Sequence, residues 1–524
     1  MANETTKSPS SLEEQGSGKQ PAVKMPKAVY FILPNECAER FCFYGINPIL
    51  NPFFSKYLGM GKEKALQFTH LFKFLSYFTP LGGAALSDSF LGKYDTIVVL
   101  SFVYVIGTAL LAVFAVPSLK SEIGALLGIF LIAVGTGGIK PCVSAHGGDQ
   151  FLDVQKEGLN KFYNYFYLSI NIGAIASNYA APAVTELECF GEPKGSCYSW
   201  AYAMCGVGKR TYVIVPSARQ FLPWIIIKVI SVATARSLRD GRKKKLLEYV
   251  KDDYPLEILQ EVRDVSTMFW VLLPAPLFWM GFDQNNSTWE NQYSQMNPYF
   301  GAWYVNVPTS TIWNPIMIVL LVPVFSNLIY PFVESRFGRF RLLDRMLAGM
   351  FFTCVAFASS AIIQTLIDQT QADGVLEYNE VSDVWECPLD REKAKGCVHG
   401  AWQIVSYFII TFAEVLFSVS GLNFTYEEVC SGPFNAYFQV GPKMKASAAS
   451  LWLLMVAIGN LLVVFLSPLV SAIGERNFYI VCIGIIASAM VLYIFIRRVY
   501  VYKEDRPVET FGLEVVDLHT ETKH

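Results

Sequence analysis

Long apolar stretches are the feature of this sequence that most restricts its fold. A helix of about 20 apolar residues crosses the roughly 30 Å hydrocarbon core of a bilayer, and the chain contains eleven such stretches and a poorer twelfth. Within lipid the backbone must bond internally, so uniformly apolar segments of this length predict α-helices and not barrel strands. The predicted spans lie near residues 28–57, 66–90, 95–117, 122–143, 162–183, 198–217, 263–287, 308–331, 343–367, 400–425, 446–472 and 477–497.

Composition argues against soluble and nucleic-acid-binding classes. Of the 524 residues, 53% are apolar and 16% are charged, whereas soluble domains carry about 25% charged residues. The formal charge of −2 provides no basic surface for nucleic acid. The sequence has no HExxH, nucleophile elbow, P-loop or Cys/His metal spacing. We therefore expect an all-α polytopic membrane protein that is not an enzyme and uses no cofactor or metal.

Basic residues in the loops predict the orientation, because loops rich in Lys and Arg stay in the cytosol. Residues 236–263 carry eight such side chains and 336–345 carry four, whereas 288–310 carry none. Both ends of the chain should therefore be cytosolic. The membrane that we expect is the plasma membrane rather than that of an acidic organelle. The expected domains are a disordered tail at 1–27, a six-helix bundle at 28–217, a cytosolic linker with a charged helix at 218–262, a second six-helix bundle at 263–500, and a tail at 501–524.

Two cytosolic turns share one spacing. Asp88-x-x-x-Gly92-Lys93 follows the second predicted span, and Glu334-x-x-x-Gly338-Arg339 follows the eighth. The repetition indicates duplicated halves, the arrangement in which two bundles rock about a site at the bilayer midplane.

The sixth span and the cysteines are less regular. From Tyr198 the apolar run stops at Gly208, too early to cross a bilayer, so we expect an abnormal span from which about ten residues are missing. Cys189 with Cys197, and Cys387 with Cys397, fall in predicted outer loops. Two local disulfides and four free thiols both remain open.

Charged residues inside the spans mark the candidate site, since each costs about 2.5–3.5 kcal/mol on insertion scales. Glu36, Glu39 and Arg40 share one helical face, and this group can hold or release a proton. Lys140, at the end of the fourth span, either snorkels to the surface or points inward to pair with the first span. Glu414, alone in the tenth span, favours a ligand ammonium as its partner.

These charges predict a dipolar cavity. Arg40 and Lys140 belong to the first half and Glu414 to the second, so a zwitterion a few residues long would fit between them. His70 is a candidate proton carrier, and Asp283 can latch the outer ends of the two halves together. The aromatic side chains that could line pockets are Tyr44, Tyr77, Trp279 and Trp452.

At these positions the sequence resembles the proton-coupled oligopeptide transporter family, a branch of the major facilitator superfamily. Residues 36–45, Glu-Cys-Ala-Glu-Arg-Phe-Cys-Phe-Tyr-Gly, match the family's first signature, and Gly137 to Pro141 with Gly147 to Phe151 match its second. Phe166-Tyr167 with Asn171 and Gly173 match the third. Further matches are Phe282-Asp283-Gln284, Asn314-Pro315 and Ala413 to Ser418.

The resemblance implies two six-helix bundles and a role for each site residue. Proton coupling would involve Glu36, Glu39, Arg40 and His70. Gating would involve Asp283, Asp88 and Lys140. Peptide binding would use Arg40 and Lys140 for the carboxylate and Glu414 with Asn171 for the amino group, completed by Tyr44, Tyr77, Trp279, Asn314 and Trp452.

The resemblance therefore predicts a monomeric symporter that imports di- and tripeptides with protons by alternating access. Its partners would be small peptides, protons and the lipid bilayer, with no nucleic acid. Two alternatives remain open. A nitrate or other small-anion carrier of the same fold would not need Glu414, and a non-transporting nutrient receptor would agree with the abnormal sixth span.

Overall fold

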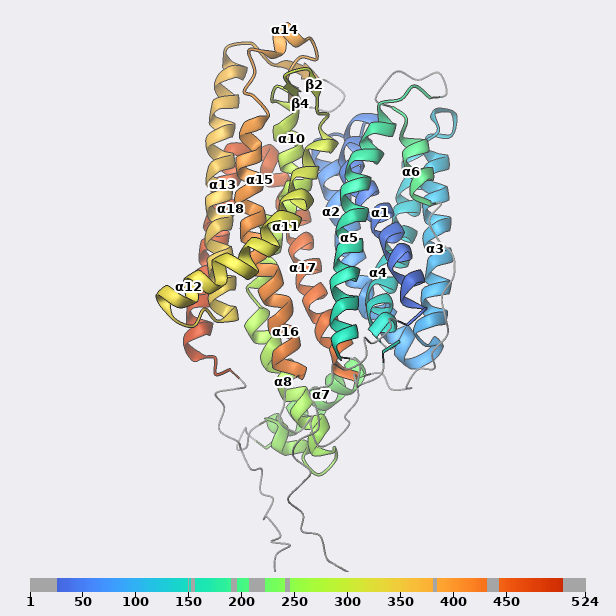
Figure 1. Cartoon of the computed structure of the whole chain (residues 1–524), viewed down its shortest axis with the longest axis vertical. Helices are drawn as coiled ribbons and strands as arrows, with labels where there is room; N and C mark the ends of the chain where they lie inside the picture. Colours follow the sequence, from blue (N-terminus) through green and yellow to red (C-terminus); the bar gives the residue numbers. More distant parts are fainter. Residues whose placement is uncertain are drawn as a thin grey trace, which may run out of the picture.

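The computed structural model describes residues 26–148, 150–151, 156–189, 196–206, 222–240, 246–379, 384–430 and 443–502. Two helical bundles, one from each half of the chain, lie side by side (Figure 1). Helix α14 (Arg391–Ala394) lies at one end of the bundles, which we call the loop end, and helix α7 (Leu222–Arg239) lies at the opposite, linker end (Figure 1).

The first bundle consists of long helices, two of which continue into a π-helical turn. Its elements are α1 (Val29–Pro52) with the π-turn η1 (Phe53–Tyr57), α2 (Lys62–Leu86) with the π-turn η2 (Ser87–Leu91), α3 (Lys93–Phe114), the 3₁₀ turn η3 (Pro117–Leu119), α4 (Glu122–Gly148), α5 (Lys156–Thr185) and α6 (Tyr198–Gly206).

The linker and the second bundle follow. Their helical elements are α7, η4 (Leu246–Val250), α8 (Leu256–Leu272), α9 (Ala275–Phe282), η5 (Asp283–Asn286), α10 (Thr288–Ser294), η6 (Pro308–Ile312), α11 (Trp313–Val324), η7 (Phe325–Ile329), α12 (Tyr330–Phe337), α13 (Leu342–Ala372), α14, α15 (Ala401–Glu414), η8 (Val415–Val419), α16 (Ser420–Cys430), α17 (Lys443–Ile473) and α18 (Glu475–Val499).

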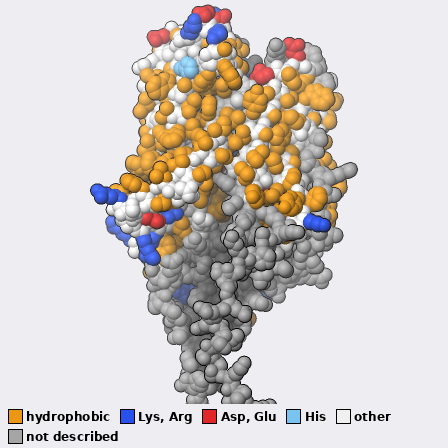
Figure 2. All heavy atoms as spheres, in the orientation of Figure 1, with side chains coloured by type: hydrophobic (Ala, Val, Ile, Leu, Met, Phe, Trp, Pro, Cys, Tyr) orange, Lys and Arg blue, Asp and Glu red, His pale blue; other side chains and the backbone are white. Residues whose placement is uncertain are grey.

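Eleven of the twelve predicted spans are helical in the described residues. Seven stretches are long and apolar enough to cross a membrane. The other four, α1, α2, α5 and the α8–α9 pair, are also helical across the predicted segments. Apolar side chains cover the middle of the visible face, and charged side chains gather at its two ends (Figure 2). The helices thus present the apolar band that a bilayer requires.

The sixth predicted span is short where the structure describes it. Helix α6 has nine residues, which extend about 14 Å at 1.5 Å per residue, about half of a bilayer. Residues 207–217 of the predicted span lie outside the described residues. In the described part, α6 packs on α1, α3 and α5 at the loop end.

The two repeated turns adopt matching backbone conformations. Gly92 has φ of 82° and Gly338 has φ of 85°, a region that side chains disfavour and glycine tolerates. Each glycine N–H donates back to the preceding helical turn, to the carbonyl of Ser87 or Glu334. The chemical reason for the repeated glycine is therefore the same in both halves.

The loop end contains small structures that the apolar pattern did not predict. Two two-stranded antiparallel sheets form there, β1 (Tyr299–Phe300) with β2 (Trp303–Tyr304) and β3 (Glu377–Asn379) with β4 (Val384–Glu386). Disulfides join Cys189 to Cys197 and Cys387 to Cys397. The structure thus selects the disulfide alternative over free thiols.

Candidate binding site between the bundles

The charged group of α1 forms a buried network. Arg40 Nε lies 2.8 Å from Glu36 Oε1, and Arg40 Nη2 lies 2.5 Å from Glu39 Oε2. Thr136 of α4 donates a hydrogen bond of 2.5 Å to Glu39 Oε1. The i, i+4 spacing of Glu36 and Arg40 places them one helical turn apart, as the sequence predicts.

Glycine allows α5 to approach this network. A side chain at Gly173 of α5 would overlap the Cys37 carbonyl oxygen of α1, so the two backbones can touch only because Gly173 has no Cβ. Asn171 lies two residues earlier on α5 and is buried. The Asn171–Gly173 signature thus belongs to the close contact between α5 and the charged helix.

Lys140 points inward and does not snorkel. Its Nζ is buried and has no hydrogen-bond partner in the described part of the chain. It lies 3.8 Å from the ring centre of Phe43 on α1 and 4.1 Å from that of Tyr77 on α2, within the range of a cation–π contact. Of the two alternatives, Lys140 thus takes the inward one, and it contacts the first span through Phe43. The carboxylates of that span, Glu36 and Glu39, are both bound by Arg40.

Glu414 is held by a neutral amide of the second half. Asn314 Nδ2 of α11 donates 2.8 Å to Glu414 Oε2 and approaches Thr411 Oγ1 at 3.0 Å. No cation pairs with Glu414 among the ion pairs of the described residues. The helix changes to the π-turn η8 directly after Glu414, and such turns are frequent at functional sites.

The charges of the two halves act on the same phenols. Tyr44 of α1 and Tyr77 of α2 both lie within electrostatic reach of Arg40 and of Glu414. The basic group of the first bundle and the acid of the second therefore both lie near Tyr44 and Tyr77. A zwitterionic ligand is complementary to this arrangement.

The two predicted tryptophans pack together. The ring centres of Trp279 on α9 and Trp452 on α17 are 5.9 Å apart, and Trp452 lies 5.9 Å from Phe417. Tyr77 of the first bundle packs on the same cluster. Gly421 makes room for this arrangement, because a Cβ there would overlap the Trp452 ring.

A polar network joins the halves nearer the loop end. The two ring nitrogens of His70 each lie 2.9 Å from a second-half oxygen, Asn460 Oδ1 and Ser287 Oγ. Asn460 Nδ2 donates 2.7 Å to Asp283 Oδ2, and Lys73 Nζ lies 3.4 Å from Asp283 Oδ1. Asp283 therefore contacts the first half through Lys73.

Sequence reasoning missed several residues of this contact. Asn460 is a buried polar residue in the middle of an otherwise apolar helix, and that contrast is a signal that the sequence did contain. Further contacts between the halves near the loop end are Lys56–Glu386 at 2.6 Å, Lys62–Glu475, Asn306–Glu186 at 2.9 Å and Asn51–Asn291 at 3.3 Å. The loop end is therefore closed by direct contact.

The side chain of Asp88 lies outside the described residues, so its predicted gating role stays a prediction. Among the residues that the structure describes, no group of three His, Cys, Asp or Glu side chains is arranged to hold a metal.

Comparison with known proteins identifies relatives of both halves. A family model, the POT family, matches residues 94–210 and 248–486, more than half of the chain. Solute carrier family 15 member 2 of Rattus norvegicus is 32% identical over 364 residues, which cover 66% of this chain and 49% of the relative. Solute carrier family 15 member 1 of Homo sapiens is 33% identical over 373 residues, covering 66% and 53%. This chain thus spans about half the length of these relatives.

The fold also has solved counterparts. A crystal structure of an auto inhibited POT family peptide transporter is 26% identical, with a TM-score of 0.71 over 92% of this chain and 99% of that chain. The predicted all-α, two-bundle fold of the major facilitator type is thereby confirmed. From the family match and the shared fold, we conclude that the chain is a multi-pass membrane protein and belongs to the POT family.

Proposed function

We propose that the chain is a proton-coupled symporter that imports di- and tripeptides by alternating access. The observation that carries the proposal is the dipolar site, with Arg40 and Lys140 in one bundle and Glu414 in the other. A free peptide has an anionic carboxyl end and a cationic amino end, which match these two walls. The description of the similar crystal structure, an auto inhibited POT family peptide transporter, supports peptides as the substrate class.

Proton coupling follows from the charge balance of the α1 network. With both acids ionised, Glu36 and Glu39 outweigh Arg40 by one negative charge, which opposes a peptide carboxylate nearby. A proton on either acid neutralises the group and leaves the guanidinium free to attract that carboxylate. Proton and peptide binding would then favour one another, which is what symport requires.

The driving force is adequate for accumulation. One inward proton gains about 2.3 kcal/mol at 100 mV, and one pH unit adds about 1.4 kcal/mol. Together these terms sustain a peptide gradient of a few hundredfold. A gradient of this size would let an importer accumulate peptide against its concentration difference.

Uptake into proteoliposomes tests the proposal. Purified full-length protein should accumulate a labelled dipeptide when the outside is acid, and accumulation should cease when a protonophore dissipates the gradient. Glu39→Gln should lose gradient-driven accumulation and retain counterflow exchange, because the amide cannot take up a proton. The matched control is Glu392→Gln, on the exposed helix α14, which should behave as wild type.

The same assay separates the alternatives. Full concentrative uptake by Glu39→Gln would contradict the assignment of the coupling group. Nitrate uptake that survives Glu414→Gln would indicate the anion carrier, since an anion brings no ammonium. Peptide binding by wild type without uptake would indicate the receptor, the alternative raised by the short sixth apolar run in the sequence.

We further infer that the loop end faces outwards, that both chain ends are cytosolic, and that a monomer acts in the plasma membrane. The support is the linker, whose residues 236–263 carry eight basic side chains and whose helix α7 lies at the opposite end (Figure 1). A membrane-impermeant amine reagent applied to intact cells should label Lys393 on α14 and spare Lys251 of the linker.

A further inference from the structure

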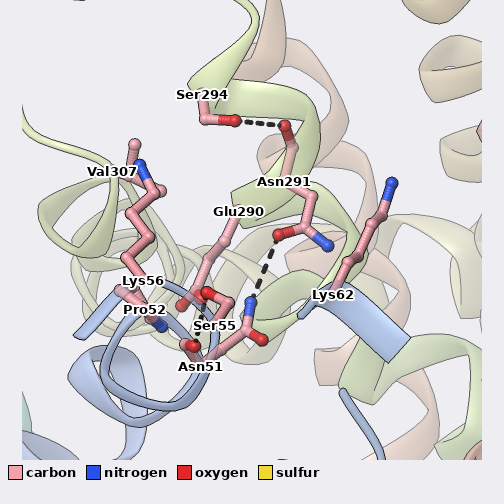
Figure 3. A pocket seen from close by; sticks show the side chains of 9 residues that line it. All are labelled: Asn51, Pro52, Ser55, Lys56, Lys62, Glu290, Asn291, Ser294 and Val307. Atoms are coloured by element: carbon pink, nitrogen blue, oxygen red, sulfur yellow. Dashed lines mark hydrogen bonds between the residues drawn. The ribbon is translucent and has the colours of Figure 1, made fainter. Parts of the chain in front are cut away.

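Glu290 of α10 is a buried acid that the dipolar site does not use. Its side chain has no exposed surface, and neither carboxylate oxygen has a hydrogen-bond partner among the described residues. It lines a cavity of about 20 Å³ between the two halves at the loop end, large enough for one water molecule. Figure 3 shows Glu290 extending from the second half towards Asn51 and Ser55 of the first.

The neighbouring polar groups are engaged with one another. The Asn51 amide is close enough to act on the Glu290 carboxylate, and its Nδ2 also donates to Asn291 Oδ1 at 3.3 Å. Asn291 Nδ2 has no partner among the described residues. Ser55 donates to the Asn51 carbonyl at 2.9 Å, and Ser294 donates to the Asn291 carbonyl at 2.8 Å (Figure 3). Both hydroxyl donors that line the cavity are thus directed to backbone carbonyls and away from the Glu290 carboxylate.

The ion pairs that join the two halves at the loop end do not include Glu290. Three lysines of the first half each pair with an acid of the second half: Lys56 with Glu386, Lys62 with Glu475 and Lys73 with Asp283. Glu290 is a fourth second-half acid at this contact, and the ion pairs of the described residues provide it with no base. Closure of the halves therefore buries Glu290 without a paired base, and Glu186 of the first half, which accepts from Asn306, adds a further acid to the same contact.

Other titratable groups near Glu290 do not supply the missing charge. Lys73 of α2 is the cation whose field reaches Glu290, and it is held by Asp283. Tyr407 of α15 and Tyr198 of α6 also lie within electrostatic reach. Tyr407 donates its hydroxyl to the Asn285 carbonyl at 2.8 Å, so it offers Glu290 no hydrogen bond.

We propose that Glu290 is a second proton-binding site, which takes up a proton when the two halves close at the loop end and releases it when they part. An ionised carboxylate that is buried without a paired counter-charge is costly, whereas the neutral acid has one O–H to donate and needs no counter-charge. Opening the loop end would expose the carboxylate to water and remove this penalty. The gating role rests on the alternating-access function proposed above, but the proton site itself does not.

Linkage fixes the sign of the effect. Because the closed state binds the additional proton, acid on the outer side stabilises closure, and closure weakens as the pH rises and that proton is lost. Glu290→Gln has the shape of the neutral acid and cannot titrate. Its closed state should therefore persist at high pH.

Infrared difference spectroscopy detects the proton directly. Full-length protein in lipid nanodiscs, without peptide, should show the C=O stretch of a neutral carboxylic acid that Glu290→Gln removes. Glu377→Gln is the matched control, because Glu377 is exposed and pairs with Lys393 within the second half, and it should keep that band. Identical carboxylic-acid bands in wild type and Glu290→Gln across the pH range would overturn the proposal.

A distance measurement tests the coupling to closure. Spin labels at Glu122→Cys and Asp373→Cys report on exposed loop-end positions of the two halves, in a background with Cys37, Cys354 and Cys430 changed to Ser. The distance should lengthen with rising pH when Glu290 is present and stay short in Glu290→Gln. A pH response that survives in Glu290→Gln would refute the coupling. If the chain moves no peptide, both experiments still give their result, so the two proposals fail independently.

Discussion

Three charges of the candidate site differ in what holds them. Arg40 is tied to two carboxylates, Lys140 lies against two aromatic rings, and Glu414 accepts from one neutral amide. The opposite charge of an ion pair offsets the attraction of the ion for a ligand. An ion held by a ring or a neutral amide has no such opposite charge beside it. Lys140 and Glu414 are therefore the end charges to which a zwitterion should respond most.

At Glu414 the predicted effect is confined to the amino end of the peptide. Glu414→Gln keeps the size of the side chain but loses the charged hydrogen bond to an ammonium, so the Kd of Ala-Ala should rise roughly 10- to 100-fold. N-acetylated Ala-Ala has no ammonium, and its Kd should change little. Calorimetric titration of purified protein measures both; an equal loss for the two ligands would show that Glu414 acts on structure and not on the amino group.

At Lys140 the predicted effect concerns the carboxylate end of the peptide. Lys140→Gln removes the cation over Phe43 and Tyr77, so the Kd of Ala-Ala should again rise about 10- to 100-fold. Ala-Ala amide lacks the carboxylate and should bind both proteins alike. Competition of each ligand against a labelled dipeptide measures both affinities. An equal loss of affinity for Ala-Ala and Ala-Ala amide would show that Lys140 acts on structure and not on the carboxylate.

Sequence reasoning found the charges of the site but not their partners. Glu36, Glu39, Arg40 and Glu414 are visible because charge inside an apolar span is rare. That Thr136 binds Glu39, or that Lys140 lies between aromatic rings, depends on how α4 packs against α1 and α2. Such packing has no local signature, which is why the sequence suggests an inward Lys140 as one alternative but not the two rings against which it lies.

At the scale of helices, close packing depends on single glycines. The backbones of helices α2 and α4 come close where Gly83 faces Gly138, and a Cβ at Gly83 would lie 2.6 Å from the Gly138 carbonyl oxygen. Backbone atoms cannot move aside as a flexible side chain does. This contact also positions α4, the helix that carries both Thr136 and Lys140.

Gly83→Ala should therefore destabilise the first bundle. Overpacking typically costs about 1–3 kcal/mol, so the midpoint of thermal unfolding in detergent should fall. The adjacent Gly82 is a matched control, because its Cβ would meet nothing within 4 Å. Gly82→Ala should be neutral or slightly stabilising, since alanine gains about 1 kcal/mol in helix propensity over glycine. Equal losses in the two variants would contradict this packing.

The predicted spans agree with the helices because apolar length alone defines a membrane helix. Features that depend on contacts between segments far apart in the sequence were not predicted. The π-turn η8 after Glu414 and the small sheets at the loop end arise from tertiary contacts and backbone pairing. The abnormal sixth span stays a prediction from Lys209 and Arg210, since residues 207–217 lie outside the described residues.

At the scale of the whole molecule, the two bundles are joined near the loop end by ion pairs between the first half's lysines and the second half's acids. Lys62 of α2 pairs with Glu475 at the start of α18, and Gln295 donates 3.0 Å to the other oxygen of Glu475. Both charged side chains are largely buried. Losing one partner therefore leaves the other charge poorly compensated in the closed state only.

Lys62→Gln should shift the molecule towards opening at the loop end. A coupling of about 1–3 kcal/mol corresponds to a 5- to 150-fold change in the ratio of closed to open molecules. The distance between spin labels at Glu122→Cys and Asp373→Cys should lengthen accordingly. The exchanged pair, Lys62→Glu with Glu475→Lys, should restore part of the short distance because the ion pair reforms with opposite direction. Lys393→Gln, which breaks the exposed Lys393–Glu377 pair within the second half, should leave the distance unchanged; opening in that control, or a short distance in Lys62→Gln, would show that the ion pair between the halves does not hold the loop end closed.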